Sequence, residues 1–69
     1  MNTREAKREV RKQEIVAAAT AVFAQKGFDG ASMDDIVQAS GLSKGGLYWH
    51  FKSKDDIIAA IALDIVVAV

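Results

Sequence analysis

The stretch Ser43-Lys-Gly-Gly-Leu-Tyr-Trp-His-Phe51, "SKGGLYWHF", decides the fold of this 69-residue chain. Ser43 is a residue type favoured at helix N-caps, so the stretch predicts a short helix over residues 44–51. Two adjacent glycines at the start of this helix are unexpected, because each costs about 0.8–1 kcal/mol relative to Ala in a helix interior. We therefore expect the glycines to serve a contact rather than the stability of the helix.

A helical wheel for this stretch separates two faces, since successive residues are about 100° apart. Leu47 and Phe51 fall within about 40° of each other and are expected to face the core. Gly45, Gly46 and Trp49 fall on the opposite side, about 180° away. The wheel thus predicts an exposed face that has been cleared of side chains, on which a ligand can approach the backbone closely.

Upstream, the pattern Ser32-Met33-Asp34-Asp35 predicts a capping box and a second helix over about 33–40. Ile36 and Val37 are its expected buried residues, with Ala39 as a further candidate. Gly41 is suited to the left-handed conformation that ends a helix. Two short helices joined by a tight turn with a glycine predict a helix-turn-helix motif, and hence an all-α domain.

The first helix is expected over about 9–26, where apolar residues recur at helical spacing and Gly27 follows the end. The apolar stripe consists of Ile15, Ala18, Ala19, Val22 and Phe23. Ser53-Lys54-Asp55-Asp56 predicts a second capping box, which opens a fourth helix. Apolar residues surround much of this fourth helix: Ile57, Ile58, Ile61, Leu63, Ile65 and Val66.

Size and composition exclude several classes of function. A 69-residue chain cannot enclose a deep catalytic cavity, so we expect no enzyme and a function carried by the surface. The absence of Cys excludes disulfides and Cys-based metal sites and suits a reducing, intracellular protein, and a single His offers no second imidazole to complete a metal site. The longest apolar run, over residues 57–69, contains Asp64 and is shorter than the roughly 20 residues that span a bilayer.

Charge is distributed unevenly along a chain whose formal net charge is zero. Residues 1–26 carry six Lys or Arg and three Glu, a net charge of +3, and residues 27–69 carry three Lys and six Asp, a net charge of −3. The three later lysines, Lys44, Lys52 and Lys54, surround the glycine stretch. Helix N-termini, nearby cations and the polar tips of Tyr48 and His50 together favour an extended polyanion such as a nucleic-acid backbone.

These residues resemble the DNA-binding domain of TetR-like transcriptional repressors over about residues 12–65. The resemblance is carried by Phe28-x-Gly30-x-Ser32-Met33-x-x-Ile36, then Gly41-Leu42-Ser43-Lys44-Gly45-x-Leu47-Tyr48-Trp49-His50-Phe51-x-x-Lys54. It implies a bacterial, cytoplasmic, homodimeric regulator whose third helices enter the major grooves of a palindromic operator. It divides the chain into a basic, flexible N-terminal arm (1–10), a helix-turn-helix domain (11–52) and a fourth helix (53–69). That last helix is expected to lead into an absent C-terminal domain, which dimerises and binds a small-molecule inducer.

Carried over by position, the resemblance implies a DNA-binding role for nine residues. Ser32 and Met33 approach the phosphate backbone. Lys44 reaches either the edge of a guanine base or a phosphate. Gly45 and Gly46 lie against the bases. Tyr48 and His50 bond phosphates, Trp49 packs on sugar-phosphate or a thymine methyl, and Lys54 pairs with a phosphate. No metal and no cofactor are expected within the 69 residues.

Departures from the family pattern reduce what can be read about the operator. Met33 stands where many relatives carry a hydroxyl residue, Val37 and Ser40 stand where Ala is common, and Gly46 stands where Thr, Ser or Ala is usual. Direct readout of bases is therefore expected to rest on few groups.

Plainer interpretations stay open for the same residues. Lys44 can be a solvated lysine, Tyr48 a packing residue, and His50 a structural histidine. The basic arm can be a solvated helix face, because Glu5, Glu9 and Glu14 alternate with its cations. The alternative function is a helical protein-interaction module that uses Trp49 and the apolar fourth helix.

Overall fold

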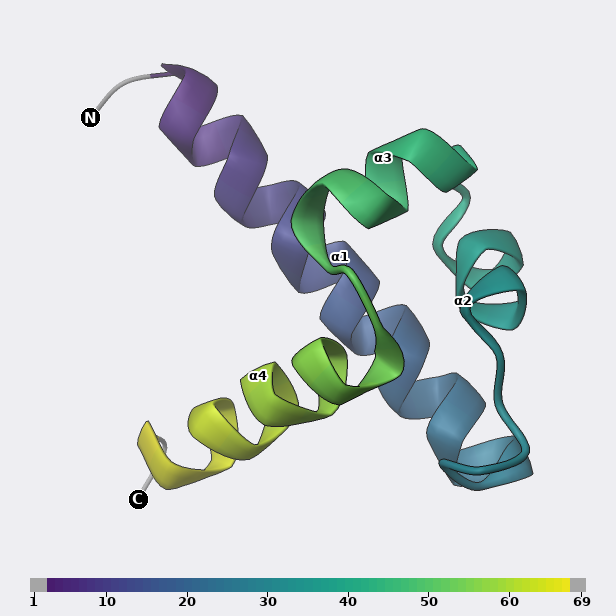
Figure 1. The fold of residues 1–69 in the computed structure, drawn as a ribbon. Helices are drawn as coiled ribbons and strands as arrows, with labels where there is room; N and C mark the ends of the chain where they lie inside the picture. Colours follow the sequence, from purple (N-terminus) through teal and green to yellow (C-terminus); the bar gives the residue numbers. More distant parts are fainter. Residues whose placement is uncertain (1–2, 68–69) are drawn as a thin grey trace.

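The computed structural model describes the backbone of residues 3–67 and the side-chain surroundings of residues 6–63. Within this range the fold is all-helical, with α1 over Thr3–Lys26, α2 over Met33–Ser40, α3 over Lys44–His50 and α4 over Lys54–Val67. Figure 1 shows α1 as a long diagonal helix, with α2 and α3 on one side and α4 leading away toward the C-terminus. The predicted fold class is confirmed, and the bounds of α2 agree with the sequence pattern.

α1 is longer than the apolar stripe predicts, because it begins at Thr3 rather than near residue 9. The expected N-terminal arm is therefore helical from residue 3, while residues 1 and 2 lie outside the described part. The charged side chains of residues 7–14 are exposed, and one pair, Arg11 and Glu14, lies 3.2 Å apart at i,i+3 spacing. Each such pair stabilises a helix by about 0.2–0.5 kcal/mol, so this ion pair helps to stabilise the part of α1 that extends beyond the core.

One apolar core joins all four helices. Its buried residues are Ile15, Ala19 and Val22 of α1, Ala31 of the following loop, Ile36 of α2, Leu47 and Phe51 at α3, and Ile57 of α4. Ala18 and Phe23 are half-buried, so the stripe predicted for α1 is confirmed. Ala39 is exposed and contributes nothing to the core, because it lies on the solvent side of α2.

The loop between α1 and α2 is closed by backbone hydrogen bonds. The Gly27 N–H donates to the Phe23 carbonyl (2.8 Å), and the Ala31 N–H donates to the Gly27 carbonyl (3.1 Å). Gly27 has a φ of 78°, the left-handed conformation that a glycine adopts without strain. The chain therefore reverses over a few residues and brings the start of α2 beside the end of α1.

The capping box of α2 forms as predicted. The Asp35 N–H donates to Ser32 Oγ, and the Ser32 N–H donates to Asp35 Oδ2, each at 3.0 Å. The same carboxylate lies 3.1 Å from the Lys26 ammonium in the last turn of α1. The Ser32 backbone N–H, followed by the Lys26 ammonium, lowers the pKa of Asp35 below its ordinary value. Asp35 therefore acts twice, as a helix cap and as a link between two helices.

The turn between α2 and α3 also follows the sequence pattern. Gly41 has a φ of 75° and its N–H donates to the Val37 carbonyl, which ends α2. Ser43 then caps α3, because its Oγ accepts from the Gly46 N–H at 3.1 Å. With Leu42 alone between these two residues, the direction of α3 relative to α2 is fixed by the turn itself.

α4 differs in part from the sequence prediction. The Asp56 N–H donates to Ser53 Oγ at 3.4 Å, but the Asp56 carboxylate accepts from the Lys52 N–H rather than from Ser53. The second capping box is therefore wrong in its reciprocal half, since Asp56 reaches one residue further back. Ile57 is buried, whereas Ile58 and Leu63 are exposed. The surroundings of Ile65 and Val66 lie outside the described residues.

The molecule is thin, measuring 38 × 32 × 16 Å. Since a helix with its side chains is about 10–12 Å across, the core is a single shallow layer between helices. A search of the described residues finds no helix long and apolar enough to cross a membrane. Because the core is shallow, the groups that could bind a ligand lie on the outer faces of the helices.

The lowered pKa of Asp35 predicts a pH-dependent contribution to stability. The carboxylate stabilises the fold above the ordinary Asp pKa of about 3.9, and this contribution is lost as pH falls through the lowered folded-state pKa. Asp35→Asn should therefore unfold at lower urea than wild type at neutral pH, and the difference should vanish in acid. Circular dichroism of urea unfolding across pH measures this, with Asp29→Asn as a control for charge. A difference that stays constant with pH contradicts the assignment.

Candidate functional site

α3 presents a bare strip of backbone to solvent. Leu47 and Phe51 are 0% and 5% exposed, so they anchor the helix on the core as the wheel predicts. On the opposite side, a Cβ built at Gly45 meets nothing within 4 Å. Trp49 lies one turn further along the same side and is 70% exposed. This combination of an open glycine and an outward tryptophan is the centre of the candidate site.

Gly46 is less open than the wheel predicts. It is half-buried, and a Cβ at this position would lie 3.2 Å from Ser43 Oγ and 3.9 Å from the Leu42 Cβ. The expectation that both glycines clear the exposed face is therefore correct for Gly45 alone. The reason is local, because the side chain that caps α3 folds back over position 46.

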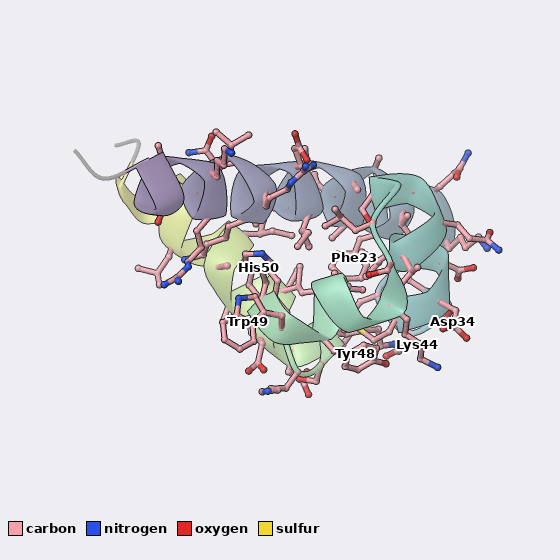
Figure 2. The ribbon with its side chains drawn as sticks, turned by 90° about the horizontal axis from the view of Figure 1, so that it is seen from above. Phe23, Asp34, Lys44, Tyr48, Trp49 and His50 are labelled. Atoms are coloured by element: carbon pink, nitrogen blue, oxygen red, sulfur yellow. The ribbon has the colours of Figure 1, made fainter. Side chains whose placement is uncertain are left out.

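Tyr48 and His50 lie on opposite flanks of α3, and both are half-buried. Figure 2 shows Lys44, Tyr48 and Trp49 along the edge of the molecule away from α1, whereas His50 lies on the side nearer α1. Lys44 and Tyr48 lie toward the start of α3, and Trp49 and His50 lie together toward its end (Figure 2).

Lys44 and Asp34 form a loose ion pair across the turn. Their charged atoms are 3.8 Å apart, and their side chains are 69% and 75% exposed. An exposed pair of this kind contributes about 0–1 kcal/mol, so water or another anion can replace the carboxylate readily. Lys44 is therefore a cation at the surface whose charge remains available to a ligand.

Ser32 and Met33, the two candidates at the start of α2, differ in their surroundings. Ser32 is exposed, and its hydroxyl accepts one capping bond while its own proton remains available for donation. Met33 is half-buried and packs against the core. Met33 is thus held mainly by apolar contacts, and Ser32 is the polar group that this end of α2 offers.

Lys54 has partners within the chain. Its ammonium donates to the Phe28 carbonyl at 2.8 Å and lies 4.7 Å from the centre of the Phe28 ring. The family resemblance implies that Lys54 binds a phosphate, and the sequence gave no sign of this contact, because Phe28 is 26 residues away. A contact between a lysine and an aromatic ring this far apart in the sequence leaves no local pattern that would predict it.

The side chains gathered at this surface are suited to the recognition of an anion. Among the described residues there is no group of three His, Cys, Asp or Glu placed to hold a metal ion. The groups gathered on the edge of α3 are one cation, one phenol, one indole and exposed backbone. Together they can bind an anionic, partly apolar surface that is long enough to touch two helices at once.

Comparison with known proteins confirms the resemblance drawn from the sequence. Residues 15–61 match the family described as bacterial regulatory proteins, tetR family. The HTH-type transcriptional regulator AcrR of Shigella flexneri is 38% identical over 50 residues, which cover 72% of this chain and 23% of AcrR. The matched region runs from the buried half of α1 into α4, so it contains the whole candidate site.

Two further relatives have similar coverage. The biofilm operon icaADBC HTH-type negative transcriptional regulator IcaR of Staphylococcus aureus (strain Newman) is 41% identical over 46 residues, 67% of this chain and 25% of IcaR. The uncharacterized HTH-type transcriptional regulator YfiR of Bacillus subtilis (strain 168) is 43% identical over 51 residues, 74% of this chain and 25% of YfiR. This chain thus spans about a quarter of the length of these relatives. No solved structure gives a significant match.

The two glycines of α3 are expected to respond differently to a methyl group. Gly45→Ala should raise the free energy of unfolding by about 0.4–1 kcal/mol, because the new Cβ meets open space. Gly46→Ala should gain less, since its Cβ presses on the Ser43 hydroxyl. In a Ser43→Ala background, Gly46→Ala should recover the full gain. Urea unfolding measures all four variants, and equal gains at both glycines in the wild-type background would contradict the geometry.

Proposed function

Because this chain belongs to the tetR family of bacterial regulatory proteins, we propose that it is the sequence-specific DNA-binding domain of a transcriptional repressor. One observation supports this most strongly, namely the open backbone of Gly45 on the outer side of α3, flanked by Lys44 and Trp49. An anionic duplex can approach such a surface more closely than it can approach a helix covered by side chains.

The dimensions of α3 suit a major groove. An α-helix with its side chains is about 10–12 Å across and enters a groove about 12 Å wide, and the seven residues of α3 would place about two turns in it. Lys44 would reach a guanine edge or a phosphate, Gly45 would lie against the bases with Gly46 behind it under the Ser43 side chain, and Trp49 would pack on sugar or a thymine methyl. Sequence reading would depend on few side chains, since two of the seven residues are glycines.

Contacts to the DNA backbone would hold α3 in the groove. The Ser32 hydroxyl at the start of α2 and the Tyr48 hydroxyl on the outer edge of α3 are the proposed phosphate donors. His50 would bond a phosphate from the other flank of α3, and Met33 would contribute at the margin, because it packs against the core. Bonds of this class fix the register of the protein on the duplex, while base contacts supply specificity.

The palindromic operator, the homodimer and the small-molecule effector are further parts of the proposal. They follow from family membership, as does action in the bacterial cytoplasm, where the operator DNA lies. In this scheme two copies place their α3 helices in successive major grooves. An effector that binds outside these 69 residues would favour a dimer geometry in which the two helices are wrongly spaced, so DNA affinity would fall by linkage.

A second candidate function rests on two exposed apolar side chains. Trp49 is 70% exposed and Leu63 is 63% exposed, and both could contact a partner protein. Salt dependence separates the two functions. DNA binding releases counterions from each neutralised phosphate, so log K falls steeply with log salt, whereas an apolar protein contact responds weakly.

The experiment is a salt titration of the binding of this chain to a labelled duplex selected from random DNA. We expect the slope of log K against log salt to be about −0.9 for each phosphate neutralised, with several phosphates per domain. Lys44→Ala should weaken binding by about 1–3 kcal/mol and relax preference at one base pair. Asp34→Asn is the matched variant for which the opposite effect is expected. It should tighten binding, because it removes an anion 3.8 Å from Lys44. A flat salt response, with no duplex enriched, would contradict the proposed function.

A further inference from the structure

Lys54 makes the longest-range side-chain hydrogen bond found among the described residues. Its ammonium donates to the Phe28 carbonyl at 2.8 Å, and the two residues are 26 positions apart. The same ammonium lies 4.7 Å from the centre of the Phe28 ring, within the distance at which a cation and an aromatic ring attract. Both groups are half-buried, so solvent screens this contact less than it screens the exposed ion pair of Lys44.

The contact occupies much of what a lysine ammonium can offer. An ammonium has three N–H donors, and here one is bonded to a carbonyl while the ring covers another side. At most a part of its hydration shell is left for an outside ligand. Lys54 thus differs from Lys44, whose nearest anion is 3.8 Å away and whose side chain is 69% exposed.

The two ends of the contact belong to different parts of the proposed DNA surface. Phe28 lies in the loop that leads to Ser32, and its ring packs on Phe23 of α1 with the centroids 5.3 Å apart. Lys54 begins α4, three residues after Phe51, which holds the end of α3 on the core. The Lys54–Phe28 contact therefore connects the loop before α2 to the joint after α3.

We propose that Lys54 is a positioning residue for DNA binding, acting through Phe28 rather than on a phosphate. The contact fixes the loop before α2 against the start of α4, so that Ser32 and the exposed side of α3 meet one duplex together. Without it, each helix keeps its own cap, but the spacing between the two sets of DNA contacts is held less firmly. The inference rests on the proposed DNA-binding function.

A double-mutant cycle with two readouts tests the proposal. Lys54→Met keeps the stem and removes the ammonium, and Phe28→Leu removes the ring and leaves the charge of the protein unchanged. Lys54→Arg is the conservative variant, since a guanidinium can also donate to the carbonyl and lie over the ring. Lys52→Met, at an exposed neighbouring position, controls for the loss of one positive charge. Urea unfolding and binding to the selected duplex are measured for each variant at a temperature where all are folded.

Five results are expected. Lys54→Met and Phe28→Leu each weaken DNA binding about three- to tenfold, and the double variant is weakened by less than the product of the two single effects, because each single variant already lacks the contact between ammonium and ring. Phe28→Leu leaves the salt slope unchanged. Lys54→Arg keeps most of the affinity, because the guanidinium can replace the ammonium at Phe28. Lys52→Met, which removes one positive charge without touching this contact, weakens binding less than Lys54→Met does. The unfolding free energies of the same four-member cycle are also non-additive, because the contact exists without DNA.

Two results would overturn the proposal. Additive effects on unfolding mean that the contact between the Lys54 ammonium and the Phe28 ring does not form in solution. Additive effects on DNA affinity, with a salt slope that changes by about 0.9 in Lys54→Met and stays unchanged in Phe28→Leu, mean that Lys54 neutralises a phosphate directly. A wild-type chain that binds no duplex would instead contradict the proposed function itself, which separates the two failures.

Discussion

The anchoring of α3 by two side chains, Leu47 and Phe51, is the constraint on which the rest of the structure depends. These residues lie one turn apart and are almost wholly buried. Because a seven-residue helix has only two turns, burying this pair determines which side of α3 faces outward. The outward side then carries Gly45 and Trp49, and its character follows from the placement of the core residues rather than from any contact made at the surface.

Caps, a turn and two side-chain contacts hold α3 in one orientation within this small fold. Caps at Ser32 and Ser43 supply hydrogen bonds to helix ends that would otherwise be open. Gly41 ends α2 so that α3 can start almost at once. The Asp35–Lys26 pair and the Lys54–Phe28 contact then tie neighbouring segments together. A thin molecule with a shallow core needs such links, because its apolar burial alone is limited.

Local patterns predicted most of the fold, and distant contacts account for most of what they missed. The α2 bounds, its capping box and the αL glycine were predictable, because each depends on residues within four positions. The early start of α1 was not, since no apolar stripe extends over its first turns. At the site, the wheel placed Leu47, Gly45 and Trp49 correctly, but it could not show that the Ser43 side chain covers Gly46. Nor could it show that Lys54 meets Phe28, because that contact exists only once the chain has folded.

The central claim is that a duplex seats against the open backbone of Gly45, and Gly45→Leu tests it most directly. Apart from its chain neighbours and the backbone of the helix itself, nothing lies within 4 Å of the Cβ position, so the variant should stay folded, with a urea midpoint at or above that of wild type. It should nevertheless lose at least about tenfold, or 1.4 kcal/mol, in affinity for the selected duplex. Ala17→Leu, at an exposed position on α1, should change neither quantity. A folded Gly45→Leu chain that binds the duplex as tightly as wild type would contradict the account.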